Sequence, residues 1–212
     1  MKQLTFLHKA NLSIQVALKE SEISAKLKEY GYDDKKIKEG EKICNLFSEL
    51  SQKLEEAREN SKVATLSLQS TRKHIHTSYS RHVALTRIAL RDVPQAIVLM
   101  GLKGRREITI DGWLEQTRNY YHYAMEHADV LKKYGIPKHE LQENQILLGQ
   151  MIELLTLQKQ TYSQAQVLAQ QKQEAFSSMQ QWYSKFIKLA RLALDEKPQQ
   201  LEALGILVRN EK

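Results

Sequence analysis

Residues that break helices or cross-link a chain are scarce in this sequence. Its 212 residues include one cysteine, three prolines and eight glycines. The single cysteine, Cys44, excludes an internal disulfide and a zinc site built from several cysteines. It lies beside Ile43 and Phe47, so we expect it to be a small buried hydrophobe. Abundant Gln, Leu, Lys, Ala and Glu with few breakers predict an all-α protein.

Long apolar runs and catalytic motifs are also missing from the sequence. No run approaches the 18 apolar residues of a membrane span. The stretch Met1–Lys9 has no apolar core typical of a signal peptide, so we expect a cytoplasmic protein. The sequence contains no glycine-rich phosphate loop and no nucleophile elbow. We therefore predict no cofactor, no metal site and no catalytic residues.

What the sequence does contain is one very long helical pattern. From Pro137 to Glu196 there is no further proline, and the only glycine is Gly149. Apolar residues recur at steps of three and four, which is typical of an amphipathic helix. At 1.5 Å per residue, about 60 residues would make a helix roughly 90 Å long. The residues of this stripe are Leu147, Met151, Leu154, Ala165, Leu168, Ala175, Met179, Trp182, Phe186, Ala190 and Ala193.

The same pattern occurs twice, at an offset of 104 residues. Residues 79–102 read like residues 183–206, with Pro94 matching Pro198 and Gly101 matching Gly205. Without a gap, the same offset pairs Tyr30-Gly31 with Tyr134-Gly135. We interpret the chain as a tandem duplication with copies at 1–104 and 105–212.

The end of each copy carries a shared stretch. In the second copy it reads Ala190-Arg191-Leu192-Ala193-Leu194, followed by Pro198-Gln199 and Leu204-Gly205. This stretch resembles the C-terminal part of bacterial all-helical proteins of uncharacterised function. The resemblance implies a helical fold and a bacterial source, and it implies no activity.

Each copy is expected to fold as a short helix, a very long helix and a short C-terminal helix. A brief extended piece, at 4–6 or 108–110, would come first, and Asp111 would cap the first helix of copy two. Gly31 and Gly135 would end the short helices, and Pro94 and Pro198 would end the long ones.

The long helices are expected to run antiparallel. The small residues Ala57, Ser61 and Ala64 would let them cross near residues 63 and 167, so that residues at one level have numbers adding up to about 230. The predicted fold is an elongated antiparallel helical bundle of two intertwined repeats with pseudo-two-fold symmetry, and we expect the repeats to form one structural domain. Each end would hold both long helices, one N-terminal helix and the other copy's C-terminal helix. In the alternative, each long helix folds back near 61–65 and 165–169.

This register predicts two polar clusters that fix the helices against each other. One contains Arg87, Glu143 and Glu126, and the other contains Arg191, Glu39 and Glu22. All six residues recur at the 104-residue offset. Their arginines would bridge the repeats by charge-assisted hydrogen bonds. The alternative is that they are surface ion pairs of little energetic value.

Acidic residues are missing from Asn60 to Arg91. This segment contains the candidate anion-binding residues Lys62, Arg72, Lys73, Arg81 and Arg91. The alternative is a solvated basic helix face, because Tyr79 is the only aromatic residue among them. His82 matches Phe186 in the repeat, so we expect it to be a partly buried packing residue. His122 and Glu126 share a helix face, but a di-iron motif is missing.

These patterns favour a non-enzymatic structural or protein-interaction module that is a monomer or a weak dimer. The alternative function is binding of nucleic acid or another polyanion through residues 62–91. An enzyme with a site in one of the end bundles is the third hypothesis.

Overall fold

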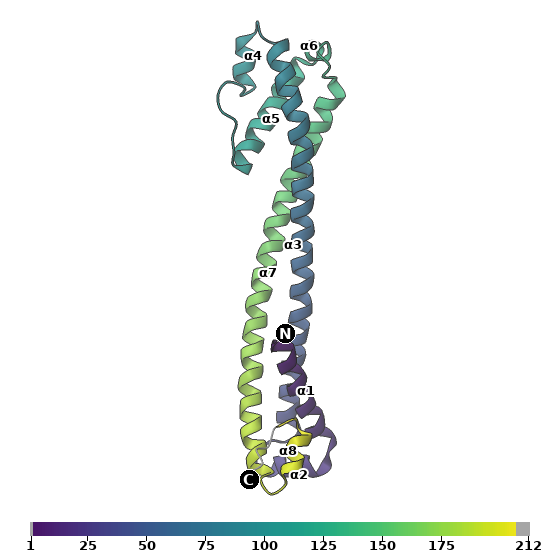
Figure 1. Ribbon diagram of the computed structural model, residues 1–212, viewed down its shortest axis with the longest axis vertical. Coiled ribbons are helices and arrows are strands. Elements are labelled where there is room, and N and C mark those ends of the chain that lie inside the picture. Colours follow the sequence, from purple (N-terminus) through teal and green to yellow (C-terminus); the bar gives the residue numbers. More distant parts are fainter. Residues whose placement is uncertain (1, 207–212) are drawn as a thin grey trace. The chain divides into compact units, whose positions relative to one another are not determined.

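The computed structural model describes residues 2–206, and all of its regular structure there is helical. Eight helices follow one another along this described part of the chain (Figure 1). They are α1 (Lys2–Lys19), α2 (Ser21–Glu29), α3 (Asp34–Ala89), α4 (Pro94–Leu99), α5 (Ile110–Glu126), α6 (Ala128–Lys132), α7 (Lys138–Ala193) and α8 (Pro198–Ala203). The predicted all-α fold is confirmed. The long helices α3 and α7 each span 56 residues without a break, so the fold-back alternative is wrong.

The helix bounds of the two halves match at the 104-residue offset. α3 and α7 begin and end 104 residues apart, and so do α4 and α8. Four glycines with positive φ, Gly31, Gly101, Gly135 and Gly205, also form two such pairs. After Gly31, for example, the amide of Tyr32 donates to the carbonyl of Leu27, and the amide of Gly31 donates to that of Lys28. This Schellman motif ends the helix at the position that a glycine favours.

The helices before each long helix differ from the prediction. Leu4–Phe6 lies inside α1 and is not extended, because one more turn of helix places Phe6 against the rings of Phe176 and Tyr183. Each predicted short helix is split in two, at Glu20 and at His127. The N-cap of α5 is Thr109, whose Oγ1 accepts from the amide of Gly112 at 3.2 Å, and not Asp111.

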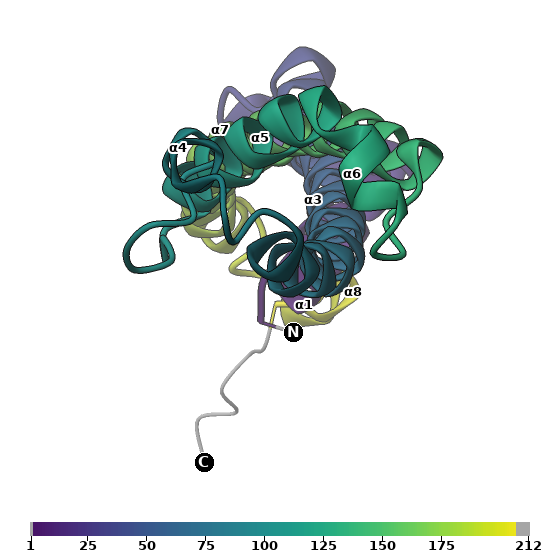
Figure 2. The same cartoon turned by 90° about the horizontal axis from the view of Figure 1, so that it is seen from above.

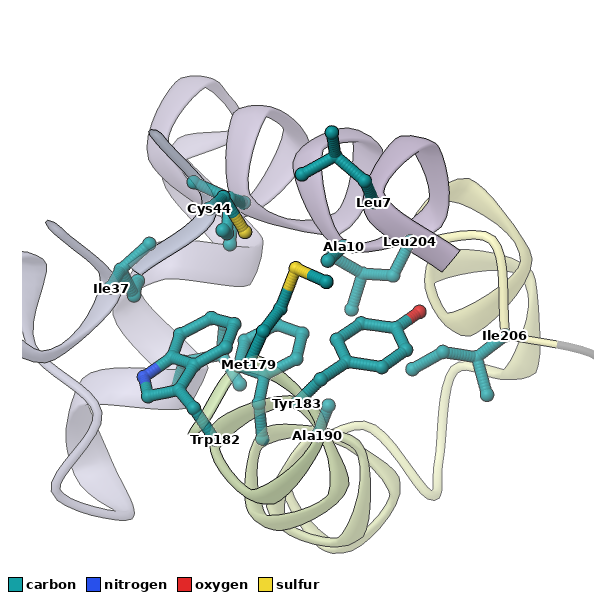
Figure 3. Packing of buried hydrophobic residues seen from close by; sticks show 14 of the residues in the cluster. Leu7, Ala10, Ile37, Cys44, Met179, Trp182, Tyr183, Ala190, Leu204 and Ile206 are labelled. Carbon is teal, nitrogen blue, oxygen red and sulfur yellow. The ribbon is translucent and has the colours of Figure 1, made fainter. Parts of the chain in front are cut away.

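The described chain packs into two compact units, and each draws on both halves of the sequence. The first unit comprises the described residues up to Arg58 and those from Ser163 onward; the second comprises Glu59–Tyr162. In the first unit α1, α2 and α8 enclose a core with the facing parts of α3 and α7, in which Met179, Trp182 and Tyr183 meet Leu7 and Cys44 (Figure 3). In the second unit α4, α5 and α6 gather around the other parts of α3 and α7 (Figures 1 and 2). The predicted helix content of each end bundle is thus present.

The register of the long helices differs from the predicted one. In the first unit Phe47 meets Phe176 with ring centroids 5.5 Å apart, and a Cβ on Gly40 would lie against the Trp182 ring. In the second unit Gln158 Nε2 donates to Thr65 Oγ1 at 3.1 Å. In both units the facing residue numbers add up to about 222, and not to 230. The predicted midpoints were each displaced by four residues, about one helical turn.

Candidate functional site

The second unit contains a buried histidine that hydrogen-bonds on both sides of its ring. His82 on α3 is fully buried. Its Nδ1 lies 3.2 Å from the hydroxyl of Tyr121 on α5, and its Nε2 lies 2.9 Å from Glu140 in the first turn of α7. Arg81 forms an ion pair with the same carboxylate. We call these four residues, Arg81, His82, Tyr121 and Glu140, the histidine network.

The electrostatics of the network keep His82 neutral and Glu140 charged. Burial lowers the pKa of His82, against the opposing effect of its hydrogen bond to Glu140. Burial alone would raise the pKa of Glu140, but hydrogen bonds from His82 and Arg81 outweigh it and lower that pKa. Neutral His82 then donates from Nε2 to Glu140 and accepts from the Tyr121 hydroxyl at Nδ1.

Further buried polar groups extend the network along α5. Tyr120 is fully buried and its hydroxyl lies 2.8 Å from Thr86 Oγ1. Burial raises the pKa of both Tyr120 and Tyr121, so both hydroxyls stay protonated and serve as hydrogen-bond partners. The ring of Tyr79 packs edge-on against Tyr120 at 5.2 Å.

The arrangement has the residue types of a general-base site. Four clefts, one beside Gln116, one beside Ile152, one beside Tyr30 and one beside Phe6, are lined by other side chains than those of His82, Tyr121 and Glu140. A catalytic base must lie within hydrogen-bond reach of a substrate proton. In the structure the histidine network links α3, α5 and α7 through the hydrogen bonds of His82.

The first unit has none of the network's residue types at the matching positions. At the matching positions Phe186 replaces His82, Ala17 replaces Tyr121 and Lys36 replaces Glu140. Phe186 is fully buried and stacks on Trp182 at 5.3 Å. Sequence reasoning identified His82 as a partly buried packing residue and missed its partners. His82, Tyr121 and Glu140 all differ from the residues 104 positions away. This shared difference is the signal in the sequence that could have identified Tyr121 and Glu140 as partners of His82.

The predicted register clusters have different partners in the structure. Arg87 Nη2 donates to the carbonyl of Leu102 at 3.0 Å. Glu22 pairs with Lys197 and accepts from Gln200 Nε2 at 2.8 Å, and the hydrogen bond from Lys197 lowers the pKa of Glu22. Glu39 pairs with Lys36 of its own helix. Within residues 2–206 no ion pair joins Arg87 to Glu143 or Glu126, or Arg191 to Glu39 or Glu22. The changed register explains this, because it moves Arg87 level with Gly135.

The candidate anion-binding residues divide into two groups. Arg81 is neutralised by Glu140, and the Arg72 guanidinium lies 5.5 Å above the ring of Trp113. Lys62, Lys73 and Arg91 are exposed, and within the described part of the chain none of them forms an ion pair. These three side chains remain available to an anion.

One apolar groove opens between α5 and α7 of the second unit. Its volume is about 330 Å³, and its apolar lining residues are Leu114, Leu148, Ile152 and Leu155. Its polar lining residues are Asp111, Glu115, Arg118, Thr156 and Lys159. We call this feature the α5–α7 groove.

The groove follows from residue exchanges between the two halves. The first unit has the apolar residues Leu7 and Ile14 where α5 has Asp111 and Arg118. It has Ser48 and Ser51 where α7 has Ile152 and Leu155. At these positions the apolar residues thus lie on the short helix in the first unit and on the long helix α7 in the second unit. There Ile152 is 43% exposed.

Metal ligands and membrane-spanning helices are not found in the described residues. No group of three or more His, Cys, Asp and Glu side chains is placed there to hold a metal ion. No described helix is both long and apolar enough to cross a membrane. No protein-family model matches the chain, and curated proteins and solved structures give no match. Function is therefore argued from the sites themselves.

Proposed function

We propose that this chain is a non-enzymatic helical module that binds a protein partner. The α5–α7 groove is the observation that carries the proposal, because apolar side chains, among them the exposed Ile152, line it together with charged ones. A groove of this kind accepts apolar side chains from one face of an amphipathic helix. In the first unit the apolar residues at the matching positions lie on the short helix α1 and the polar ones on the long helix α3. The fold itself therefore does not require the groove.

The internal repeat supports the same proposal. A duplication, in a bacterial protein as the resemblance implies, would yield two copies of one helical unit, and one copy could then change its surface while the other keeps its packing. The matching helix bounds at the 104-residue offset support this origin.

Site-directed photo-crosslinking tests the proposal. A photoreactive amino acid at Ile152, in the groove, should give one discrete cross-linked protein. The same group at Ile146, which is 62% exposed and does not line the groove, should not. The purified partner should then bind the wild-type chain and lose affinity for the Ile152→Ser/Leu155→Ser variant, which carries the residues of the first unit. Equal cross-linking from both positions would contradict the proposal.

The second candidate function is polyanion binding through residues 62–91. The exposed, unpaired Lys62, Lys73 and Arg91 support it, together with the missing acidic residues of that segment. A salt titration with a polyanion tests it, since phosphate contacts make the logarithm of the binding constant fall linearly with the logarithm of salt concentration.

A further inference from the structure

The positive charge of the second unit comes from two segments that are distant in sequence. The connection between α4 and α5 contains Lys103, Arg105 and Arg106. Arg106 Nη1 donates to Ser80 Oγ on α3 at 3.3 Å, and its guanidinium lies 5.7 Å from the ring centroid of Tyr79. The hydrogen bond from Arg87 to the carbonyl of Leu102 holds the start of the same connection at α3. The connection thus adds its cations to a helix segment without acidic residues.

On α3 the exposed basic residues Lys73 and His76 lie on the same face as Ser80. Lys73 and His76 precede Ser80 by seven and four residues, which places all three on one side of the helix. Both Lys73 and His76 are exposed. We call Lys73, His76, Arg105 and Arg106 the composite basic face.

The aromatic residues next to this face hold arginines and cannot hold bases. Tyr79 is 1% exposed and Trp113 is 4% exposed. Their rings contact the guanidinium groups of Arg106 and Arg72, which reduces the freedom those side chains would lose on binding. Proteins that bind single strands use accessible rings on which bases stack, and among the described residues of this face no Phe, Tyr or Trp ring is exposed.

We propose that the composite basic face binds double-stranded nucleic acid through its phosphates, without reading the base sequence. This inference rests on the polyanion candidate function and specifies its site and ligand. It moves the site from residues 62–91 alone to the junction of α3 with the α4–α5 connection. Arg81, which pairs with Glu140, is excluded from it.

The first unit shows that the fold does not require these charges. At the matching positions of α7, Ser177 replaces Lys73, Gln180 replaces His76 and Phe176 replaces Arg72. A helix of the same length and bounds therefore forms with neutral residues there. Lys73→Ser is consequently a substitution that the fold already accommodates at the matching position.

The test is fluorescence anisotropy of the full chain with a short duplex of arbitrary sequence, as DNA and as RNA, and with the corresponding single strand. Salt is varied between about 50 and 200 mM. The variants are Arg105→Gln/Arg106→Gln and Lys73→Ser. The matched control is Lys185→Gln/Lys188→Gln, which removes the same charge from exposed positions of the first unit. Thermal unfolding checks that each variant is folded; if the double arginine variant does not fold, Lys73→Ser decides the test.

We expect the arginine variant to bind the duplex about tenfold or more weakly at about 50 mM salt, with a salt slope smaller by nearly 2. Lys73→Ser should reduce the slope by nearly 1, and the control should bind within about twofold of wild type. If the chain binds the DNA duplex, the RNA duplex or both, the result supports the site and shows which nucleic acid it binds. Equal losses in the variants and the control, or tighter binding of the single strand, would overturn the site and leave polyanion binding standing. No binding to any nucleic acid at low salt would overturn both.

Discussion

Gly40 lies in the interior of α3, where alanine would ordinarily be the better helix former. Glycine in a helix interior costs roughly 0.5–1 kcal/mol relative to alanine. A Cβ at Gly40, however, would lie 2.2 Å from an atom of the Trp182 ring. Trp182 is 9% exposed, and its Nε1 donates to the carbonyl of Lys36 at 3.3 Å, so the ring has little room to move.

We therefore predict that Gly40→Ala destabilises the protein by about 1–3 kcal/mol, as overpacking of a core does. The matched control is Gly149→Ala in α7, where a Cβ would meet nothing within 4 Å. That substitution should stabilise the protein by roughly 0.5–1 kcal/mol. The free energies of unfolding come from urea titrations. A stabilising Gly40→Ala would contradict the close packing of Trp182.

The histidine network predicts a loss of stability in acid. Burial lowers the pKa of His82 below its ordinary value of 6.5 in the folded state. The unfolded chain therefore binds more protons as the pH falls below 6.5, and the free energy of unfolding decreases. The lowered pKa of Glu140 adds a second loss below its ordinary value of 4.5. Tyr121 and Arg81 are the other titratable groups at His82, and the raised pKa of Tyr121 keeps its hydroxyl protonated over this range.

His82→Phe carries the residue of the first unit, and it should remove the first of these two losses. We expect the difference in melting temperature between about pH 7.5 and pH 5.5 to be smaller in this variant than in wild type. His74→Gln removes an exposed histidine of the same helix and should leave the difference unchanged. An unchanged pH dependence in His82→Phe would show that the network does not couple protonation to folding.

At the scale of the helix, two residues at the start of α5, Thr109 and Asp111, can be compared as its N-cap. Thr109 has extended backbone angles and accepts the amide of Gly112, whereas Asp111 lies one residue inside the helix. Thr109→Ala should cost about 1 kcal/mol in the free energy of unfolding. Asp111→Asn, which removes only the charge, should cost less. The reverse order in urea titrations would restore Asp111 as the cap.

The long helices could be predicted from the sequence because the information that determines them is local. Scarce breakers and a continuous apolar stripe specify α3 and α7, and each terminal glycine or proline marks a helix end. The splits at Glu20 and His127 could not be predicted in this way, since neither residue is a helix breaker. The extra turn of α1 was missed because it depends on Phe6 meeting two rings of α7.

For the whole molecule, the register was the step that sequence reasoning could not supply. The apolar stripes of two long helices match at several offsets, one or two turns apart, because their spacing repeats. One of these offsets is favoured because large side chains must face small ones, as the Trp182 ring faces Gly40. The shift displaced the predicted partners of Arg87 and Arg191. The histidine network was missed for a related reason, since its members come from three helices and meet only in the correct register.

The two units have separate cores, and a matched pair of residues can test how far they unfold separately. Leu27 and Leu131 occupy positions 104 residues apart, and both are fully buried. Leu27 belongs to the core of the first unit, and Leu131 to that of the second. Replacing either leucine by alanine should cost about 2–5 kcal/mol locally.

Because each side chain packs within one core, the loss should be confined mainly to that unit. Hydrogen exchange reports such local opening. In Leu27→Ala we expect faster amide exchange in residues 2–58 and 163–206, with residues 59–162 close to wild type. In Leu131→Ala we expect the opposite. If either variant raises exchange equally throughout, the continuous helices α3 and α7 couple the two cores, and the molecule unfolds as one cooperative unit.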